Sequence, residues 1–196
     1  MAAINIRGTS GSGKSTLIRK VMSLYDVQEP VFREGRKQPI GYTCRYADRK
    51  PLYVVGHYET PCGGCDTING VDRVYEMVWR ALARLEHVIF EGLIIASDVN
   101  RAIELKDFDG MVLELDTDIS TCIASIQSRR DARGDDRELD PSNTMKKQKL
   151  IAAQRVRFVE SGIDFRLLSR EDAYVACCQK LGIADLMERA NAAGER

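Results

Sequence analysis

The chain contains the stretch Gly8-Thr9-Ser10-Gly11-Ser12-Gly13-Lys14-Ser15, which fits the pattern G-x-x-x-x-G-K-[ST] of a phosphate-binding P-loop. An apolar run at residues 2–6 precedes it and is typical of a buried parallel strand. Apolar residues recur at helical spacing over residues 17–24. Strand, glycine-rich turn and helix in this order form the context in which the motif works, so the stretch predicts where the centre of the fold lies.

The pattern predicts both a fold class and a set of nucleotide contacts. We expect an α/β fold of the three-layer P-loop NTPase type, with a central parallel sheet. Glycines in the loop allow consecutive N–H groups to point at phosphate oxygens, and the helix behind them adds positive potential. Lys14 is expected at the β- and γ-phosphates, Ser15 at Mg²⁺ and Thr16 at the α-phosphate, with ATP and Mg²⁺ as cofactors. The expected nucleotide-binding residues are Gly8, Thr9, Ser10, Gly11, Ser12, Gly13, Lys14, Ser15 and Thr16.

Length and charge limit the other possibilities. The 196 residues suit one domain, residues 1–196, with insertions. The formal net charge is zero, so a binding site for a polyanion has to be a local basic patch. No apolar run reaches 18 residues and no leader precedes the P-loop, which favours a cytoplasmic protein without a membrane partner. Its six cysteines are then expected to be thiols, and the oligomeric state is not readable.

Residues 30–60 follow an alternating, aromatic pattern that predicts a β-hairpin inserted after the first helix. Two strands are expected, at residues 41–46 and 52–58. Basic residues outnumber acidic ones between residues 33 and 50, and tyrosines are interleaved with them, which suits a nucleic-acid backbone and a stacked base. The alternative is an ordinary solvated hairpin. The candidate substrate-binding residues are Tyr42, Arg45, Tyr46, His57 and Tyr58.

Two acids near the end of this hairpin are candidates for the general base. Glu59 ends the second strand, and Asp66 lies in the glycine-rich loop TPCGGCDTIN, residues 60–69. Loops at the carboxyl ends of strands contact substrates in open α/β sheets, so the sequence leaves both acids open, with a slight preference for Asp66. Cys62 and Cys65 have the spacing of half a zinc site, but a tight turn that exposes backbone N–H groups is the better interpretation.

The second half of the chain adds a metal candidate and a lid. Strand 87–91 ends in Glu91, at the position of a Walker-B-type acid that holds the Mg²⁺ shell; a structural salt bridge is the alternative. Helices are expected at 71–85, 97–106, 119–130 and 170–181, strands at 110–115 and 162–168, a long basic helix from Pro141 through 157, and a frayed tail from Ala190. Residues 129–141 resemble a lid, in which the expected catalytic arginines are Arg129, Arg130 and Arg133, ahead of Arg137.

The segment from His87 to Gly134 resembles, as a whole, the P-loop kinases of the uridine kinase and phosphoribulokinase type. VIFEG, LELDTD and SRRDARG follow in the order of that group, and the YETP turn at residues 58–61 is similar to its substrate region, where an acid acts as general base. Two features depart from the group: Glu59 replaces the usual Asp, and the CGGCD loop has no counterpart. The hairpin and GHYETPCGGCDTI also resemble bacteriophage kinases that phosphorylate 5-hydroxymethyluracil within DNA, which implies a DNA substrate.

Three functions therefore stay open at this stage. The preferred one is ATP-dependent transfer of the γ-phosphate to the hydroxymethyl group of 5-hydroxymethyluracil in phage DNA, a step in thymidine hypermodification in the host cytoplasm. The first alternative is a nucleoside, nucleotide or other small-molecule kinase of the uridine-kinase type. The second is a regulatory ATPase without a phosphoacceptor, against which the lid arginines argue.

Overall fold

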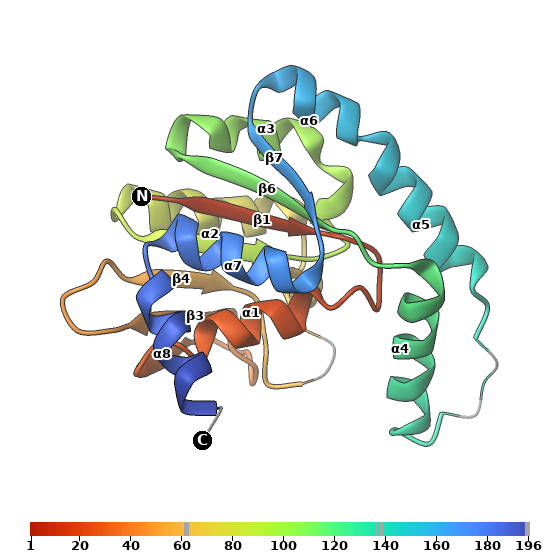
Figure 1. Cartoon of the computed structure of the whole chain (residues 1–196). Coiled ribbons are helices and arrows are strands. Elements are labelled where there is room, and N and C mark those ends of the chain that lie inside the picture. Colours follow the sequence, from red (N-terminus) through yellow and green to blue (C-terminus); the bar gives the residue numbers. More distant parts are fainter. Residues whose placement is uncertain (61–62, 136, 138, 195–196) are drawn as a thin grey trace.

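The computed structural model describes residues 1–60, 63–135, 137 and 139–194. Seven strands form one sheet in the order β2-β3-β4-β5-β1-β6-β7, and the five from β4 to β7 in that order are parallel (Figure 1). The predicted α/β fold with a central, mostly parallel sheet is thereby confirmed. The strands are β1 (Ala3–Arg7), β2 (Val27–Val31), β3 (Gly41–Arg45), β4 (Leu52–Val55), β5 (His87–Glu91), β6 (Gly110–Leu115) and β7 (Asp164–Leu168).

Helices cover both faces of the sheet and make the three predicted layers. Alternate residues of the buried strands point to opposite faces: Ile4, Ile6 and Ile89 join one hydrophobic cluster, and Val88 and Phe90 join the other. The first cluster lies under α1, α7 and α8, and the second under α2, α3 and α6. The helices are α1 (Lys14–Met22), α2 (Val71–Ala83), α3 (Val99–Glu104), α4 (Ile119–Asp131), α5 (Ser142–Ala153), α6 (Arg155–Ser161), α7 (Arg170–Leu181) and α8 (Ala184–Gly194).

The predicted hairpin is present as β3 and β4, but it extends the main sheet. β4 is buried along its whole length and runs parallel to β5, while β3 runs antiparallel to β4. The sequence analysis missed β2, an exposed strand that pairs with β3 and forms one edge of the sheet. Pro30 lies in β2, and proline is tolerated there because an edge strand leaves half of its N–H groups unpaired.

Two expectations at the C-terminal end were wrong. The long basic helix is divided at Gln154 into α5 and α6, and the expected frayed tail is mostly the helix α8. The buried Arg7 contacts the chain where the two helices meet. It donates hydrogen bonds to the Gln154 side chain and to the Ala96 carbonyl. Its guanidinium also lies over the Phe158 ring, and burial lowers the pKa of Arg7 to about 10.

Helices α4 and α5 form an arm beside the sheet, joined by the segment that contains the expected lid (Figure 1). The start of α5 contacts the P-loop, since Thr9 Oγ1 donates a 3.1 Å hydrogen bond to the Thr144 carbonyl. Gln148 Nε2 also donates to the carbonyl of Thr117, two residues after the end of β6. Within the described residues, no helix combines the length and apolar character needed to cross a membrane.

Candidate active site

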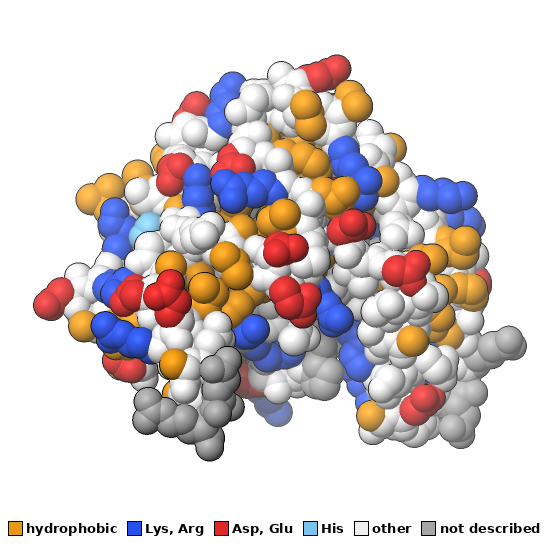
Figure 2. Space-filling model, in the orientation of Figure 1, with side chains coloured by type: hydrophobic (Ala, Val, Ile, Leu, Met, Phe, Trp, Pro, Cys, Tyr) orange, Lys and Arg blue, Asp and Glu red, His pale blue; other side chains and the backbone are white. Residues whose placement is uncertain are grey.

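A cleft of about 850 Å³ lies at the carboxyl ends of the central strands, between the P-loop and α4. Figure 2 shows a hollow between the α4 arm and the rest of the molecule, with Lys and Arg side chains at its edge. This is the edge at which open α/β sheets bind ligands, because the loops after several parallel strands converge there. The cleft is lined by Ser10, Gly11, Gly13, Lys14, Ser15, Thr16, Arg19, Gly63, Asp66, Thr67, Glu91, Leu93, Thr121, Ala124, Ser125, Ser128, Arg129 and Arg170.

The P-loop connects β1, the middle one of the five parallel strands, to α1 in the arrangement that the motif predicts. Gly8, Gly11 and Gly13 all have positive φ values. At Gly11 a side chain would also collide with the neighbouring helix, because a Cβ would lie 2.2 Å from the Cys122 carbonyl oxygen. The loop is further held by Thr117, whose hydroxyl donates a 3.1 Å hydrogen bond to the Ser12 carbonyl. Such a loop leaves its amides directed at one point, where an anion can bind.

Lys14, Ser15 and Glu91 meet at the closed end of the cleft. The Ser15 hydroxyl donates a 2.6 Å hydrogen bond to Glu91 Oε1, and Lys14 Nζ is 4.0 Å from Glu91 Oε2. They meet because Ile6 of β1 is paired with Glu91 of β5, so both strands end at the same level. Glu91 is 2% exposed, and burial raises its pKa, although Lys14 and the Ser15 hydroxyl act in the opposite direction.

Asp66 lies in a short 3₁₀ turn, Cys65–Thr67, on the opposite side of the cleft. Its two carboxylate oxygens accept hydrogen bonds from the backbone N–H groups of Leu93 and Ile94, at 3.0 and 2.8 Å. These amides belong to the segment after Glu91, so the turn and the end of β5 are held together. Each carboxylate oxygen retains a second lone pair, and the side chain is exposed to the cleft.

Glu59 has a different position from Asp66. It is exposed, and it is not among the residues that line the cleft. The segment around it is closed by a bridge between His57 and Gly64, in which Gly64 N–H donates to the His57 carbonyl at 2.7 Å. Gly64 has a φ of +74°, and a Cβ there would lie 2.4 Å from Glu91 Oε1. The loop that contains Asp66 therefore packs directly on the Glu91 carboxylate.

The three lid arginines are not equivalent. Arg129 lines the cleft, and its Nε donates a 3.1 Å hydrogen bond to the Ser125 carbonyl one turn earlier in α4. Arg130 donates to the Arg137 carbonyl, and Arg133 is exposed beyond the end of α4; neither lines the cleft. The expected lid also includes residues 136 and 138, which lie outside the described residues.

The structure does not bring the candidate substrate-binding residues of the hairpin to the cleft. Tyr42 and Tyr58 are 6% and 5% exposed, and their rings pack against each other in the hydrophobic core. His57 is buried, and Tyr46 packs partly against the same core. Arg45 forms an ion pair with Glu29 at the other end of the antiparallel strands. Alternation places Tyr42 on the covered face of β3, and His57 and Tyr58 are buried just after β4, so in this conformation these three rings cannot stack on a base.

Two arginines that line the cleft were missed by the sequence analysis. Arg19 donates a 2.8 Å hydrogen bond from Nε to the Tyr58 carbonyl and another hydrogen bond to the Thr60 carbonyl. It follows Ser15 by four residues and so lies on the same face of α1. This spacing in the sequence could have placed Arg19 beside the P-loop. Arg170 is the first residue of α7, separated from β7 only by Ser169, and packs against Gly13, a place that the strand-end rule also indicates.

The expected cysteine pair gives no metal site among the described residues. Cys65 is fully buried, its thiol donates towards the Val55 carbonyl, and burial raises its pKa well above the usual range. Cys62 lies outside the described residues. Within the part of the chain that the structure describes, no group of three or more His, Cys, Asp or Glu side chains could hold a metal ion.

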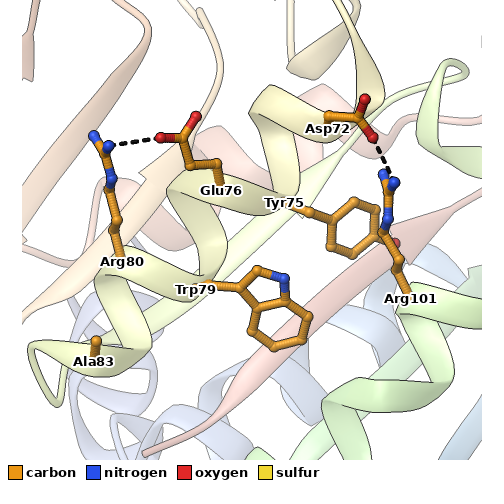
Figure 3. A pocket seen from close by; sticks show the side chains of 7 residues that line it. All are labelled: Asp72, Tyr75, Glu76, Trp79, Arg80, Ala83 and Arg101. Atoms are coloured by element: carbon orange, nitrogen blue, oxygen red, sulfur yellow. Dashed lines mark hydrogen bonds and ion pairs between the residues drawn. The ribbon is translucent and has the colours of Figure 1, made fainter.

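A second cavity, of about 490 Å³, lies on the outer face of α2 and holds none of the candidate site residues (Figure 3). Tyr75 and Trp79 form its apolar floor, and Trp79 also packs on Phe108. Two ion pairs border it, Arg80 with Glu76 and Arg101 with Asp72. Its charged groups are thus paired with one another, whereas those of the large cleft converge on an open space.

A P-loop whose cleft also holds acids and an arginine from the α4 arm defines a phosphotransferase of the P-loop kinase class. Within this class the chain belongs to the 5-hmdU DNA kinase family. It is 45% identical over 181 residues to the 5-hmdU DNA kinase of Pseudomonas phage PaMx11, and the match covers 91% of this chain and 96% of that protein. As a kinase the chain uses a nucleotide as phosphate donor.

Two further relatives carry the same name. The 5-hmdU DNA kinase of Delftia phage PhiW-14 is 30% identical, over 82% of this chain and 65% of that protein. The one of Pseudomonas phage M6 is 26% identical, over 88% of this chain and 94% of that protein. A solved structure of deoxyadenosine kinase from M. mycoides aligns with 97% of this chain and 98% of its own, at 16% identity and a TM-score of 0.44. No protein-family model matches the chain.

Proposed function

We propose that the chain transfers the γ-phosphate of ATP to the hydroxymethyl oxygen of 5-hydroxymethyluracil bases in phage DNA, a step in thymidine hypermodification. The relatives named 5-hmdU DNA kinase support this acceptor. The observation that carries the proposal is that one cleft holds the P-loop at one side and the Asp66 carboxylate at the other. A donor phosphate and an acceptor hydroxyl can therefore meet in the same cavity.

The donor side acts through position and charge. The amides of residues 11–15 and the Lys14 ammonium bind the β- and γ-phosphates, and Thr16 is at hand for the α-phosphate. Lys14 Nζ donates to the Thr9 carbonyl at 2.9 Å, so its side chain already lies along the loop. Phosphates would replace that carbonyl as the partner of the Lys14 ammonium group, whose side chain is already mostly buried.

Ser15 and Glu91 fit a magnesium ion. Both present oxygen atoms, the ligands that Mg²⁺ prefers, and their side chains are already in contact. We place the Ser15 hydroxyl on the ion and the Glu91 carboxylate on its water shell. Bound Mg²⁺ supplies positive charge at the β- and γ-phosphates. The buried Glu91 carboxylate then gains a cation beside it, which offsets the unfavourable burial of its charge.

Asp66 is the proposed general base. The acceptor oxygen attacks the γ-phosphorus as the bond from that phosphorus to the bridging oxygen of ADP breaks, and the hydroxyl proton passes to Asp66. The two amides that bind Asp66 hold its carboxylate in place at the cleft, where it can accept a proton. Glu59 could take this role only if its loop moved into the cleft.

Arg129 is the lid arginine that we place nearest to the transferring phosphate, because it already lines the cleft. Arg130 and Arg133 would join it if the arm closed over bound nucleotide, as lids of phosphotransferases do. Such closure also excludes water and so limits transfer of the phosphate to water.

The acceptor base must leave the helical stack to reach Asp66, or it must lie in single-stranded DNA. A DNA acceptor also implies that the enzyme works in the host cytoplasm, where phage DNA is made.

Labelled γ-phosphate transfer tests the proposal. The intact chain is offered four acceptors in parallel: DNA containing 5-hydroxymethyluracil, the same DNA with thymine, free 5-hydroxymethyldeoxyuridine, and uridine. We expect label on the first DNA and none on the second, and the loss of label with Lys14→Ala. Label on a free nucleoside with none on either DNA would contradict the proposal and favour a small-molecule kinase.

A further inference from the structure

The β2–β3 loop, residues 32–40, lies at the same edge of the sheet as the P-loop. β4 is parallel to β5, so Val55 and Glu91 both end at this edge. β3 runs antiparallel to β4, which places Gly41 opposite Val55, and β2 runs antiparallel to β3, which places Val31 opposite Gly41. The connection from Val31 to Gly41 must therefore leave and re-enter the sheet at the catalytic edge.

A direct contact joins this loop to the acceptor side of the cleft. Arg36 donates a 2.6 Å hydrogen bond from its guanidinium to the carbonyl of Thr67. Thr67 lines the cleft and follows Asp66, the proposed general base. At its base the loop is held by hydrogen bonds from Ile40 N–H to the Val31 carbonyl and from Gly56 N–H to the Ile40 carbonyl, both 2.8 Å. The loop is thus a fixed rim of the acceptor side.

The side chains of this rim have the chemistry of a nucleic-acid contact. Arg33 and Lys37 are exposed, Arg36 is half-buried, and Glu34 is the one acid of residues 32–40. Phe32 is 55% exposed and directly precedes Arg33 in the chain. Basic groups bind the phosphates of a DNA strand, and an exposed aromatic ring stacks on a base.

Two other basic regions fit this role less well. The turn end of the β3–β4 hairpin, with Arg45 and Lys50, lies at the opposite edge of the sheet, away from the cleft. Helix α5 carries exposed lysines, but its hydrogen bonds join it to Thr9 and Thr117, on the P-loop side.

We propose that the β2–β3 loop binds the DNA strand that flanks the target base. Phe32 stacks on a neighbouring base, and Arg33 and Lys37 bind phosphates. This rests on the proposed function.

Phosphate transfer to a single-stranded 20-mer with one 5-hydroxymethyluracil tests the two cations. In Arg33→Gln/Lys37→Gln we expect KM for the 20-mer to rise roughly tenfold. The slope of log KM against log salt should flatten by about 1.4, because each lost phosphate contact lowers the slope by about 0.7 on single-stranded DNA. KM for ATP and the melting temperature should not change. The matched control is Arg45→Gln/Lys50→Gln, which removes the same charge at the opposite edge and should behave as wild type.

Phe32→Ala should raise KM for the 20-mer about tenfold, since stacking on one base contributes on that order, and Phe32→Trp should restore it. The proposal is overturned if the Arg33/Lys37 variant keeps the wild-type KM and salt slope, or if the control variant loses as much. An unchanged KM in Phe32→Ala overturns the stacking assignment. Failure of the proposed function is a separate result, in which the wild-type chain itself transfers no label to the 20-mer.

Discussion

The Ser15 hydroxyl donates a 2.6 Å hydrogen bond to Glu91 Oε1, although the two residues are 76 positions apart in the chain. This contact joins the start of α1 to the end of β5 and places Lys14 Nζ 4.0 Å from the other carboxylate oxygen. Three groups expected at the phosphates and the metal are therefore assembled before any ligand binds. Preorganisation of this kind lowers the free energy of reorganisation in the transition state.

Replacing Glu91 by Gln should separate catalysis from stability. Glutamine keeps the shape and an oxygen for Ser15 but removes the charge, so we expect phosphate transfer to fall roughly 10- to 100-fold, the usual effect of losing a partner of a metal site. Burial raises the pKa of Glu91, so its ionisation at pH 7 disfavours the folded state and the variant should melt at or above the wild-type temperature.

Glu114→Gln is the matched control for Glu91→Gln. Glu114 is a buried carboxylate near the end of β6, the strand that pairs with β1. Its Oε1 accepts a 2.7 Å hydrogen bond from Arg155. Removing the charge of Glu114 weakens its ion pair with Arg155, so the melting temperature should fall. The turnover number should stay within about twofold, because Arg155 does not line the cleft in which the phosphates are expected. A fully active Glu91→Gln enzyme would contradict the assignment of Glu91.

Asp66→Asn should lower kcat by a factor on the order of 10² to 10⁴, the range that general-base catalysis contributes. Glu59→Gln should leave kcat within about twofold, because Glu59 is exposed and does not line the cleft. Steady-state kinetics at saturating ATP measures both, and KM for ATP should stay constant. Because asparagine offers one acceptor oxygen to two backbone amides, the melting temperature must be measured as well. Equal losses in the two variants would refute the choice of Asp66.

Gly64 (φ +74°, ψ −160°) and Gly70 (φ +99°, ψ 136°) allow a test of packing, since both combine a positive φ with an extended ψ, which side chains other than glycine's rarely tolerate. An alanine at either position should therefore destabilise the fold by about 1–3 kcal/mol. At Gly64 the new Cβ would also lie 2.4 Å from Glu91 Oε1, whereas at Gly70 nothing lies within 4 Å. Urea unfolding measures the stability of both variants and turnover measures their activity. Only Gly64→Ala should lose activity. Normal turnover in that variant would mean that the Glu91 carboxylate can move without consequence.

His87 should make the fold sensitive to acid. Burial, together with the nearby Lys50, lowers the pKa of His87 from 6.5 to about 4, and its Nδ1 accepts a hydrogen bond from the Ala2 amide. Between pH 4 and 6.5 the unfolded chain therefore binds more protons at this residue than the folded chain. The free energy of unfolding should fall as the pH drops through this window and should not depend on His87 above it.

The carboxylates of the protein also respond to acid, so the His87 effect has to be isolated by a variant. His87→Asn keeps an acceptor for the Ala2 amide but cannot be protonated. Urea midpoints at pH 4.5 and 7.5 should differ more for the wild type than for His87→Asn. Identical differences would show that His87 is not desolvated as the structure indicates.

The elements that the sequence analysis predicted correctly are those with strong local patterns. The β1–P-loop–α1 unit follows from a specific motif between an apolar run and a helical periodicity, and Glu91 was readable because it ends a continuous apolar strand. The edge strand β2 was missed because it is exposed and contains a proline, which gives it little hydrophobic pattern. Helix α8 was missed because a tail of small residues resembles a frayed terminus.

The sequence by itself predicted a phosphate-binding P-loop and its position in the chain, since consecutive residues carry that information. Only the tertiary structure decided which other residues share the cleft. Packing buried Tyr42 and Tyr58 in the core, while strand direction sent Arg45 to the far edge and brought the β2–β3 loop to Thr67. Pairing of β1 with β5 brought Glu91 to Ser15. Such contacts depend on sheet order and register, which are set by long-range packing and not by any one segment.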